Sequence, residues 1–292
     1  MIDGLYTLRE ILAPAEQARF AVAAFCIWNA ESADAVLAAA QAEQAPVILM
    51  VGPPEAPLLG LDNYARLVRL LAGNYEVPVC LHLDHSVRAE MAEQALQAGF
   101  PSVMLDYSDR PLQENLATTR AVVESARRTG ASVEAEIGHV GRADGTSNEV
   151  MTAQTFLTEP EEAAHFAAAT QVDALAVSVG TAHGLGPGLP VLDFDRLAEI
   201  NRRVAVPLVL HGGTGRCPEQ VRRAISLGVR KVNIASDLNR VFVQAMAQAL
   251  RDGQGYFWHA TALGEMKSAL QALVQKHLRL VGASGKAGLY RG

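Results

Sequence analysis

The sequence of 292 residues is poor in cysteine and, for most of its length, contains no lysine. Its three cysteines, Cys26, Cys80 and Cys217, are odd in number and widely spaced, which indicates reduced thiols rather than a disulfide framework. Only four of the 25 basic residues are lysines, and the first of them is Lys231. An enzyme that uses a lysine amine as its nucleophile would therefore have few candidate residues here.

The sequence also lacks the segments that would direct a chain to nucleic acid or to a membrane. Its basic residues do not cluster and its net charge is −6, so neither nucleic acid nor an anionic membrane is predicted as a partner. Residues 1–17 include acidic side chains and lack the apolar stretch of a signal peptide. No other stretch is long and apolar enough to span a bilayer. We therefore expect a globular cytoplasmic enzyme.

Short apolar runs rich in β-branched residues recur along most of the chain, and amphipathic or alanine-rich stretches separate them. Near-continuous apolar strands that alternate with helices indicate a parallel sheet covered on its faces. Eight such units in one chain predict a closed (β/α)₈ TIM barrel, in the α/β class, rather than an open sheet. The runs are residues 20–28, 45–52, 77–84, 101–107, 131–138, 173–180, 206–213 and 230–236.

The remainder of the chain has a helical pattern. Nothing resembles a linker between domains, so we expect residues 1–292 to form one barrel domain with a helical tail from about residue 240. The tail contains two helical stretches, residues 240–252 and 265–282. Extra helices after a closed barrel often pack against a partner subunit, which favours a homo-oligomer.

Polar side chains gather near the carboxyl ends of the apolar runs, where the strands of a barrel carry its function. Histidines buried only for packing would show no preference for one end of the strands. Three imidazoles that leave a fourth position open are typical of catalytic zinc, and His85, His183 and His211 follow three different strands. The other polar residues at these ends are His82, Asp84, Asp106, Glu134, Glu136, Asn233 and Ser236.

The remaining histidines fit a metal site less well. Strand alternation turns His82 to the opposite face from His85, so we place His82 behind the ligands rather than among them. Surface or packing roles are expected for those in predicted helices, His165, His259 and His277.

The stretch "HGGTG", residues 211–215, predicts a phosphate site. Its glycines present successive backbone N–H groups with no side chain in the way, and such groups bind phosphate without lysine. The alternative is a tight turn that needs glycine for a positive φ. Phosphate sites of these barrels lie after strands seven and eight, which favours phosphate here.

Seven motifs, in this order and spacing, resemble the class II, zinc-dependent ketose-bisphosphate aldolases, a family that includes fructose- and tagatose-bisphosphate aldolases. They are "LHLDHS", "GFPSVMLDYS", "SVEAEIG", "VDALAVSVGTAHG", "LDFDRLAEI", "PLVLHGGTG" and "KVNIASDLN". The resemblance runs from about residue 5 to residue 287. It implies zinc bound by His85, His183 and His211, with Asp84 as the residue that shuttles the proton of the aldehyde oxygen.

The resemblance also implies the contacts of the substrate. Asp106 and Glu136 match acidic positions behind the ligands, and members of the family are usually homodimers or homotetramers. Some use a monovalent cation, Na⁺ or K⁺, near the phosphate. The implied contacts of dihydroxyacetone phosphate are Gly184, Gly212, Gly213, Thr214, Asn233, Ile234, Ala235 and Ser236.

The chemistry of an aldol cleavage favours a metal-dependent mechanism for this sequence. Breaking the carbon–carbon bond leaves an enediolate, which is stabilised either as an enamine on lysine or by a metal on the oxygen. Lys231 is expected at the closed bottom of the barrel, and the other lysines lie in the tail. No lysine is then available at the mouth. Asn233 would hydrogen-bond the developing enediolate.

Several positions depart from the family, so the sequence predicts the reaction class better than the sugar. Cys26 and Trp28 stand where the family has asparagines, Gly52 where it has serine, Arg110 where a hydrophobic residue is usual, and Arg142 where it has glycine.

Two further residues are assigned roles from their positions relative to the family's motifs. Asp144 lies near the place of the family glutamate that moves the C1 proton, in a loop from about 138 to 160 that is long enough to act as a lid, and Glu149 is the second choice. Arg279 lies where some relatives send an arginine into the neighbouring subunit's site to hold a second phosphate.

Two other functions compete with an aldolase as readings of this sequence. A metal-dependent hydrolase on this barrel would need His-x-His at the end of the first strand, which has no histidine. A sugar-phosphate-binding protein that lost catalysis stays as the alternative, although it would not need Asp84 beside three zinc ligands.

Overall fold

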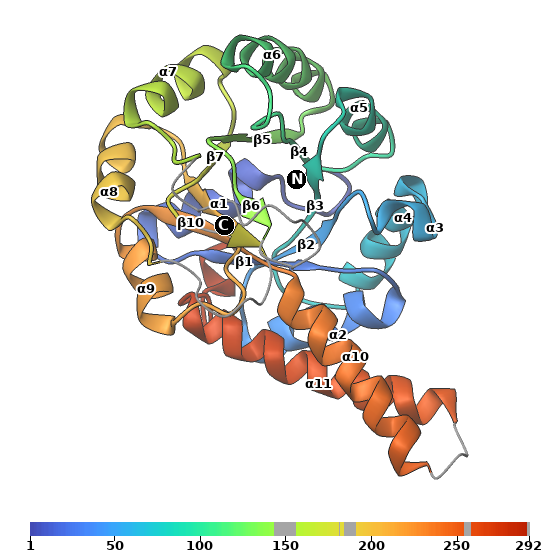
Figure 1. Cartoon of the computed structure of the whole chain (residues 1–292). Helices are drawn as coiled ribbons and strands as arrows, with labels where there is room; N and C mark the ends of the chain where they lie inside the picture. Colours follow the sequence, from blue (N-terminus) through green and yellow to red (C-terminus); the bar gives the residue numbers. More distant parts are fainter. Residues whose placement is uncertain (143–155, 181, 184–190, 254–257, 291–292) are drawn as a thin grey trace.

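Within the described residues, the main body of the molecule is a closed barrel of eight parallel strands surrounded by helices (Figure 1). The computed structural model describes residues 1–142, 156–180, 182–183, 191–253 and 258–290, with backbone alone for residues 141, 142, 182 and 183. Each barrel strand coincides with one of the apolar runs, so the predicted TIM barrel is confirmed. The strands are β1 (Val22–Cys26), β2 (Val47–Val51), β3 (Val79–Ser86), β4 (Ser102–Leu105), β5 (Ser132–Ile137), β7 (Ala174–Val177), β9 (Leu208–Leu210) and β10 (Val229–Ile234).

The strands follow one another around the barrel in the order β1-β10-β9-β7-β5-β4-β3-β2. Because all pairs are parallel, every carboxyl end opens on the same mouth. A short separate pair, β6 (Gly141–Arg142) with β8 (Ala182–His183), places Arg142 in register with His183. The helices between the strands are α2 (Ala30–Glu43), α3 (Ala56–Leu59), α4 (Leu61–Ala72), α5 (Ala89–Gln97), α6 (Leu112–Thr129), α7 (Pro160–Thr170), α8 (Phe194–Arg203) and α9 (Pro218–Ser226).

Helix α1 (Leu8–Ala18) closes the amino-terminal end of the barrel. Thr7 and Glu10 cap its first turn reciprocally, and the helix packs against β1, β3, β5 and β10. It buries an apolar face, Leu8, Ile11, Leu12 and Ala15. This plug leaves the opposite end, where the strands finish, as the open end of the barrel.

The carboxyl-terminal helices confirm the predicted tail. Helices α10 (Ser236–Asp252) and α11 (His259–Leu280) lie side by side and extend away from the barrel (Figure 1), followed by the 3₁₀ turn η1 (Ala287–Tyr290). Helix α11 also packs along α2. Large apolar side chains stay exposed on this tail, among them Val243, Leu250 and Trp258. No helix in the described ranges is long and apolar enough to cross a membrane.

Strand β3 is the longest strand of the barrel in the described part of the chain. It has eight residues, and its pairing with β4 shifts register between Leu83 and Ser86. His85 adopts φ 47°, a left-handed conformation that is uncommon outside glycine. The irregularity re-aims the last residues of the strand, as bulges beside active sites commonly do.

Candidate active site

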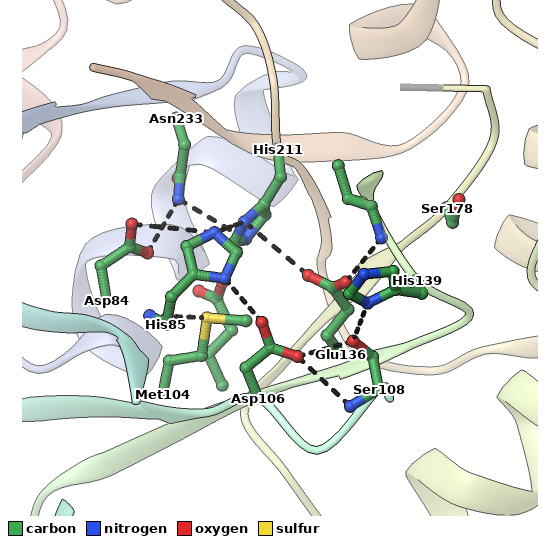
Figure 2. A network of polar contacts seen from close by, with 12 residues as sticks. Asp84, His85, Met104, Asp106, Ser108, Glu136, His139, Ser178, His211 and Asn233 are labelled. Carbon is green, nitrogen blue, oxygen red and sulfur yellow. Dashed lines mark hydrogen bonds and ion pairs between the residues drawn. The ribbon is translucent and has the colours of Figure 1, made fainter. Parts of the chain in front are cut away.

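Two of the predicted zinc ligands face each other at the mouth. Nδ1 of His211, after β9, lies 2.7 Å from Nε2 of His85, at the end of β3. Their ring centroids are 4.4 Å apart (Figure 2). The pair is almost enclosed, because His211 is fully buried and the His85 side chain is 23% exposed. The structure thus brings two imidazoles from opposite sides of the barrel to one point.

A carboxylate lies against the other nitrogen of each ring. Nδ1 of His85 is 2.8 Å from Oδ2 of Asp106, and Nε2 of His211 is 2.9 Å from Oε1 of Glu134. The Ser108 hydroxyl donates to Asp106 over 2.6 Å. Such carboxylates fix the imidazole tautomer, so that the nitrogens that face each other are left to bind a metal.

Asp84 stands beside this pair. Nδ2 of Asn233 donates to its Oδ1 over 2.9 Å, and its Oδ2 lies 4.0 Å from Nε2 of His85 (Figure 2). Ligand atoms of Asp84, His85 and His211 all lie within 4.8 Å of one another, a spacing that could hold a metal ion. The side chain of Asp84 is 14% exposed, so it faces the open mouth while it adjoins the histidines.

The electrostatics of the pair suit a cation. Burial opposes a charge on His85, but the carboxylates of Asp84, Asp106 and Glu136 raise the pKa of this imidazole to about 10. Burial and the neighbouring charge of His85 lower the pKa of His211 well below its usual value. Burial and the charge of Asp106 raise the pKa of Glu136 to about 8. A proton on His85 therefore occupies the place that a metal would take.

Strand alternation predicted that His82 lies on the opposite face of β3 from His85, but both side chains approach Asp84. Nε2 of His82 lies 3.8 Å from Asp84 and 3.7 Å from Glu134, and its Nδ1 lies 2.7 Å from the Ser102 hydroxyl. That prediction is wrong because the register shift and the left-handed backbone at His85 interrupt the alternation. His82 is fully buried, and ligand atoms of His82, Asp84 and Glu134 also lie within 4.8 Å of one another, so its place behind the ligands stays a prediction.

Lys231 was expected at the closed bottom of the barrel, but its side chain reaches further. Its Nζ lies 2.8 and 3.1 Å from the two oxygens of Glu134, the residue that contacts His211. The lysine is fully buried and ion-paired, so it offers no accessible amine for a Schiff base. The sequence placed Glu134 at the end of a strand but gave it no role. Its contacts with both Lys231 and His211 appear only in three dimensions.

The expected phosphate site combines a glycine loop with the start of a long helix. Gly212 has φ 63°, and a side chain on Gly213 would collide with Val232 and with the carbonyl of Asn233. These positions and Thr214 are buried. Ile234 ends β10, and Ala235 precedes Ser236, where α10 begins. No described side chain caps that helix, so its first N–H groups are available for an anion.

Arg216, which sequence reasoning missed, supports the glycine loop. Its Nε donates to the carbonyl of Gly212 over 3.0 Å, and its Nη2 donates to that of Gly180 over 3.1 Å. Burial lowers the pKa of this guanidinium to about 10. The arginine thus ties the loop after β9 to the loop after β7.

The end of β2, where Gly52 lies, is held by a contact within its own loop. The N–H of Gly52 donates to Oε2 of Glu55 over 3.1 Å. Burial and the nearby carboxylates of Glu55 and Asp84 raise the pKa of the Cys26 thiol well above its usual value. Sequence reasoning missed Glu55, which adds a carboxylate to the wall beside Asp84.

Two of the other residues that differ from the family pattern make contacts outside the histidine cluster. The Trp28 ring packs edge-on against Phe242 of α10, with centroids 5.2 Å apart. Arg110 pairs with Asp109, and both side chains are more than half exposed.

Arg279 does not join the cluster in its own chain. Its guanidinium pairs with Glu43 through contacts of 3.0 and 2.5 Å. Glu43 ends α2, which runs from the mouth back to the closed end of the barrel. A contact between Arg279 and the site of a neighbouring subunit stays a prediction.

Some predicted residues lie outside the described part of the chain. Gly184, Asp144 and Glu149 are not described, and for His183 and Arg142 only the backbone is. The backbone of His183 pairs with β6, in a position after β7. The third ligand and the loop acid therefore stay predictions.

Comparison with known proteins points to one family. The family model of class II fructose-bisphosphate aldolases matches residues 6–286. A fructose-bisphosphate aldolase from Geobacillus stearothermophilus is 38% identical over 289 residues, 97% of this chain and 99% of that protein. The crystal structure of the YdjI aldolase from Escherichia coli K12 is 30% identical and superposes with a TM-score of 0.83, covering 97% of this chain and 99% of that one.

A more distant structure shares the fold. A fructose-bisphosphate aldolase from Campylobacter jejuni is 24% identical, with a TM-score of 0.81 and 97% of each chain covered.

The raised pKa of His85 predicts how metal affinity depends on pH. Because a metal must displace a proton held with a pKa of about 10, its apparent affinity should fall as the pH falls. For one proton the loss is about tenfold per pH unit between pH 8 and pH 6. Titration of the metal-free chain with Zn²⁺ against a chelator of known pH dependence measures it. A constant affinity over this range would contradict the assignment of His85.

Proposed function

Because the chain belongs to the class II fructose-bisphosphate aldolase family and is thus a carbon–carbon lyase, we propose a zinc-dependent, reversible cleavage of a ketose phosphate or bisphosphate. The products are dihydroxyacetone phosphate and an aldehyde. Fructose 1,6-bisphosphate and tagatose 1,6-bisphosphate are the model substrates. The observation that carries the proposal is the convergence of His85 and His211 on one point beside Asp84.

The donor set fits zinc. The two facing nitrogens are of the type that Zn²⁺ prefers, and the opposite nitrogen of each ring is held by Asp106 or Glu134. We assign the third ligand to His183, whose backbone follows β7. Zinc, when bound, would supply Lewis-acid polarisation of the ketose carbonyl.

Asp84 is the proposed general acid and base. In cleavage it takes the proton of the hydroxyl on the carbon that becomes the aldehyde, and in synthesis it returns that proton. Asn233 holds the carboxylate through one amide hydrogen. The second hydrogen of that amide is the proposed donor to the enediolate, a contact of the oxyanion-hole type.

The phosphate of dihydroxyacetone phosphate is assigned to the backbone of Gly212, Gly213 and Thr214, with Gly184, and to the start of α10 at Ser236. The buried glycine loop and the uncapped helix start support this assignment. A monovalent cation, Na⁺ or K⁺, is proposed beside the phosphate.

The C1 proton is assigned to an acid on the loop after β5. Asp144 is the first choice and Glu149 the second, because either could reach the enediolate when the loop closes.

A homodimer or homotetramer in the cytoplasm is the proposed state. Val243, Leu250 and Trp258 keep an apolar surface exposed on α10 and beside α11, where a second copy could cover it.

The alternative is a sugar-phosphate-binding protein without catalysis. Retention of Asp84, held by Asn233 next to the histidines, disfavours it because binding alone does not require a proton shuttle.

The first test concerns the metal. Protein purified without chelator should contain about one zinc per chain, as expected for one three-histidine site. The double variant His183→Ala/His211→Ala should lose it, whereas His165→Ala, in α7, should keep it. Elemental analysis measures both. Stoichiometric zinc in the double variant would refute the ligand assignment.

The second test concerns Asp84. Asp84→Asn should keep its zinc and its fold but lose cleavage by a factor of roughly 10² or more, because the general base is gone. Asp109→Asn, an exposed acid outside the cluster, serves as the matched control. Cleavage of fructose and tagatose bisphosphates is followed by release of dihydroxyacetone phosphate. Near-normal cleavage by Asp84→Asn would remove this residue from the mechanism.

The third test decides whether Arg279 holds a second phosphate. In its own chain the guanidinium pairs with Glu43 at the end of α2. If Arg279 holds a second phosphate in a neighbouring subunit's site, Arg279→Ala should raise the KM for a ketose bisphosphate by about tenfold or more at unchanged kcat, because a charge-assisted contact is lost. An unchanged KM would show that the role fails.

A further inference from the structure

We propose that Lys231 is a positioning residue for the metal: through the carboxylate of Glu134, it holds His211 in the orientation that the ion needs. The inference rests on the proposed zinc site but concerns residues beneath it. Lys231 does not touch the ligands or the expected substrate, and it acts through one intermediate side chain.

The pair lies in the interior of the barrel. The side chains of Lys231, from β10, and Glu134, from β5, are both 0% exposed, and Nζ lies within 2.8 and 3.1 Å of the two carboxylate oxygens. A charged group this deeply buried is costly unless an opposite charge accompanies it. Each partner therefore requires the other.

Glu134 connects this pair to the metal site. Its Oε1 accepts from Nζ of Lys231 over 3.1 Å and lies 2.9 Å from Nε2 of His211. An ionised carboxylate only accepts hydrogen bonds, so Nε2 carries the hydrogen and Nδ1 presents its lone pair. That Nδ1 is the atom that faces His85. The buried ammonium thus determines which nitrogen of His211 is offered to a metal.

The carboxylates behind the two histidines differ in how their charge is stabilised. Asp106, behind His85, has the Ser108 hydroxyl as a donor and a side chain that is 12% exposed, so water can help to stabilise its charge. Glu134 is fully buried, and another ring nitrogen that can act as a donor, Nε2 of His82, lies 3.7 Å from its Oε2. Without Lys231, Glu134 would turn toward that donor and release His211.

Zinc affinity, rather than activity alone, tests the proposal. In the full-length chain, Lys231→Met should weaken zinc binding by about 10- to 100-fold, as loss of a partner behind a metal ligand commonly does. The visible spectrum of the Co²⁺-loaded variant should shift, because the ligand geometry changes. Unchanged affinity and an unchanged spectrum would overturn the proposal.

Arg230→Met is the matched control. Arg230 is the preceding residue of the same strand, and its Nε pairs with Glu16 of α1 over 2.9 Å, away from the histidines. Loss of this second ion pair should lower stability without changing zinc affinity. If both variants lose zinc equally, the effect of Lys231 is only structural.

A charge-matched double variant separates charge from packing, even if Lys231→Met alone fails to fold. Glu134→Gln leaves the buried ammonium of Lys231 without a carboxylate partner beneath His211 and should bind zinc weakly. Lys231→Met/Glu134→Gln removes both charges and keeps an amide oxygen for His211, so it should bind zinc within about threefold of the wild type. Equal affinities of Glu134→Gln and the double variant would contradict the proposal. Absence of zinc from the wild type would instead refute the proposed function.

Discussion

Closure of a parallel barrel is the constraint on which the other features of this molecule depend. It brings the carboxyl ends of all eight strands to one mouth, so polar residues far apart in sequence converge in a space that water hardly enters. Each buried charge there needs a partner close by, because the low-dielectric interior penalises an isolated one. The chain meets this need by sharing partners. Glu134 serves Lys231 and His211, and Asp106 serves His85 and Ser108. The same contacts that stabilise the interior also orient the imidazoles.

The sequence predicted the barrel well because its signals are local. An apolar run bounded by turns and followed by an amphipathic stretch forms a strand and a helix whatever the rest of the chain does, and all eight runs became barrel strands. The convergence of His85 with His211 and Asp84 followed from the same logic, since parallel strands end at one edge. The face of the strand on which an individual side chain lies was harder to predict. His82 was misplaced because a register shift near Leu83 and the positive φ of His85 break the alternation that the prediction assumed.

The contacts that the sequence did not predict are those between distant side chains. The sequences of β5 and β10 do not show that Glu134 contacts Lys231 across the barrel, because residues 97 positions apart leave no local pattern that predicts a contact. The length of the Lys231 side chain also matters: its backbone is in register with Val22 at the start of β1, whereas its ammonium reaches Glu134, which contacts His211. Arg279 is another such residue. Its place in a motif predicts a second phosphate, which stays a prediction, whereas its contact with Glu43 at the end of α2 could not be predicted from the sequence.

The charges of the cluster explain why a dication suits this site. Four carboxylates, those of Asp84, Asp106, Glu134 and Glu136, gather around the histidines, and Lys231 pairs with one of them, so the carboxylates outnumber the fixed positive charge of this lysine. The metal-free chain offsets this excess with protons, one on His85, whose pKa is raised to about 10, and one on Glu136, whose pKa is raised to about 8. A dication at the facing nitrogens can replace such protons and supply the same charge at a single point. Asp84, at the edge of the cluster and held by Asn233, adjoins the open mouth, which is where a base for the substrate hydroxyl has to stand.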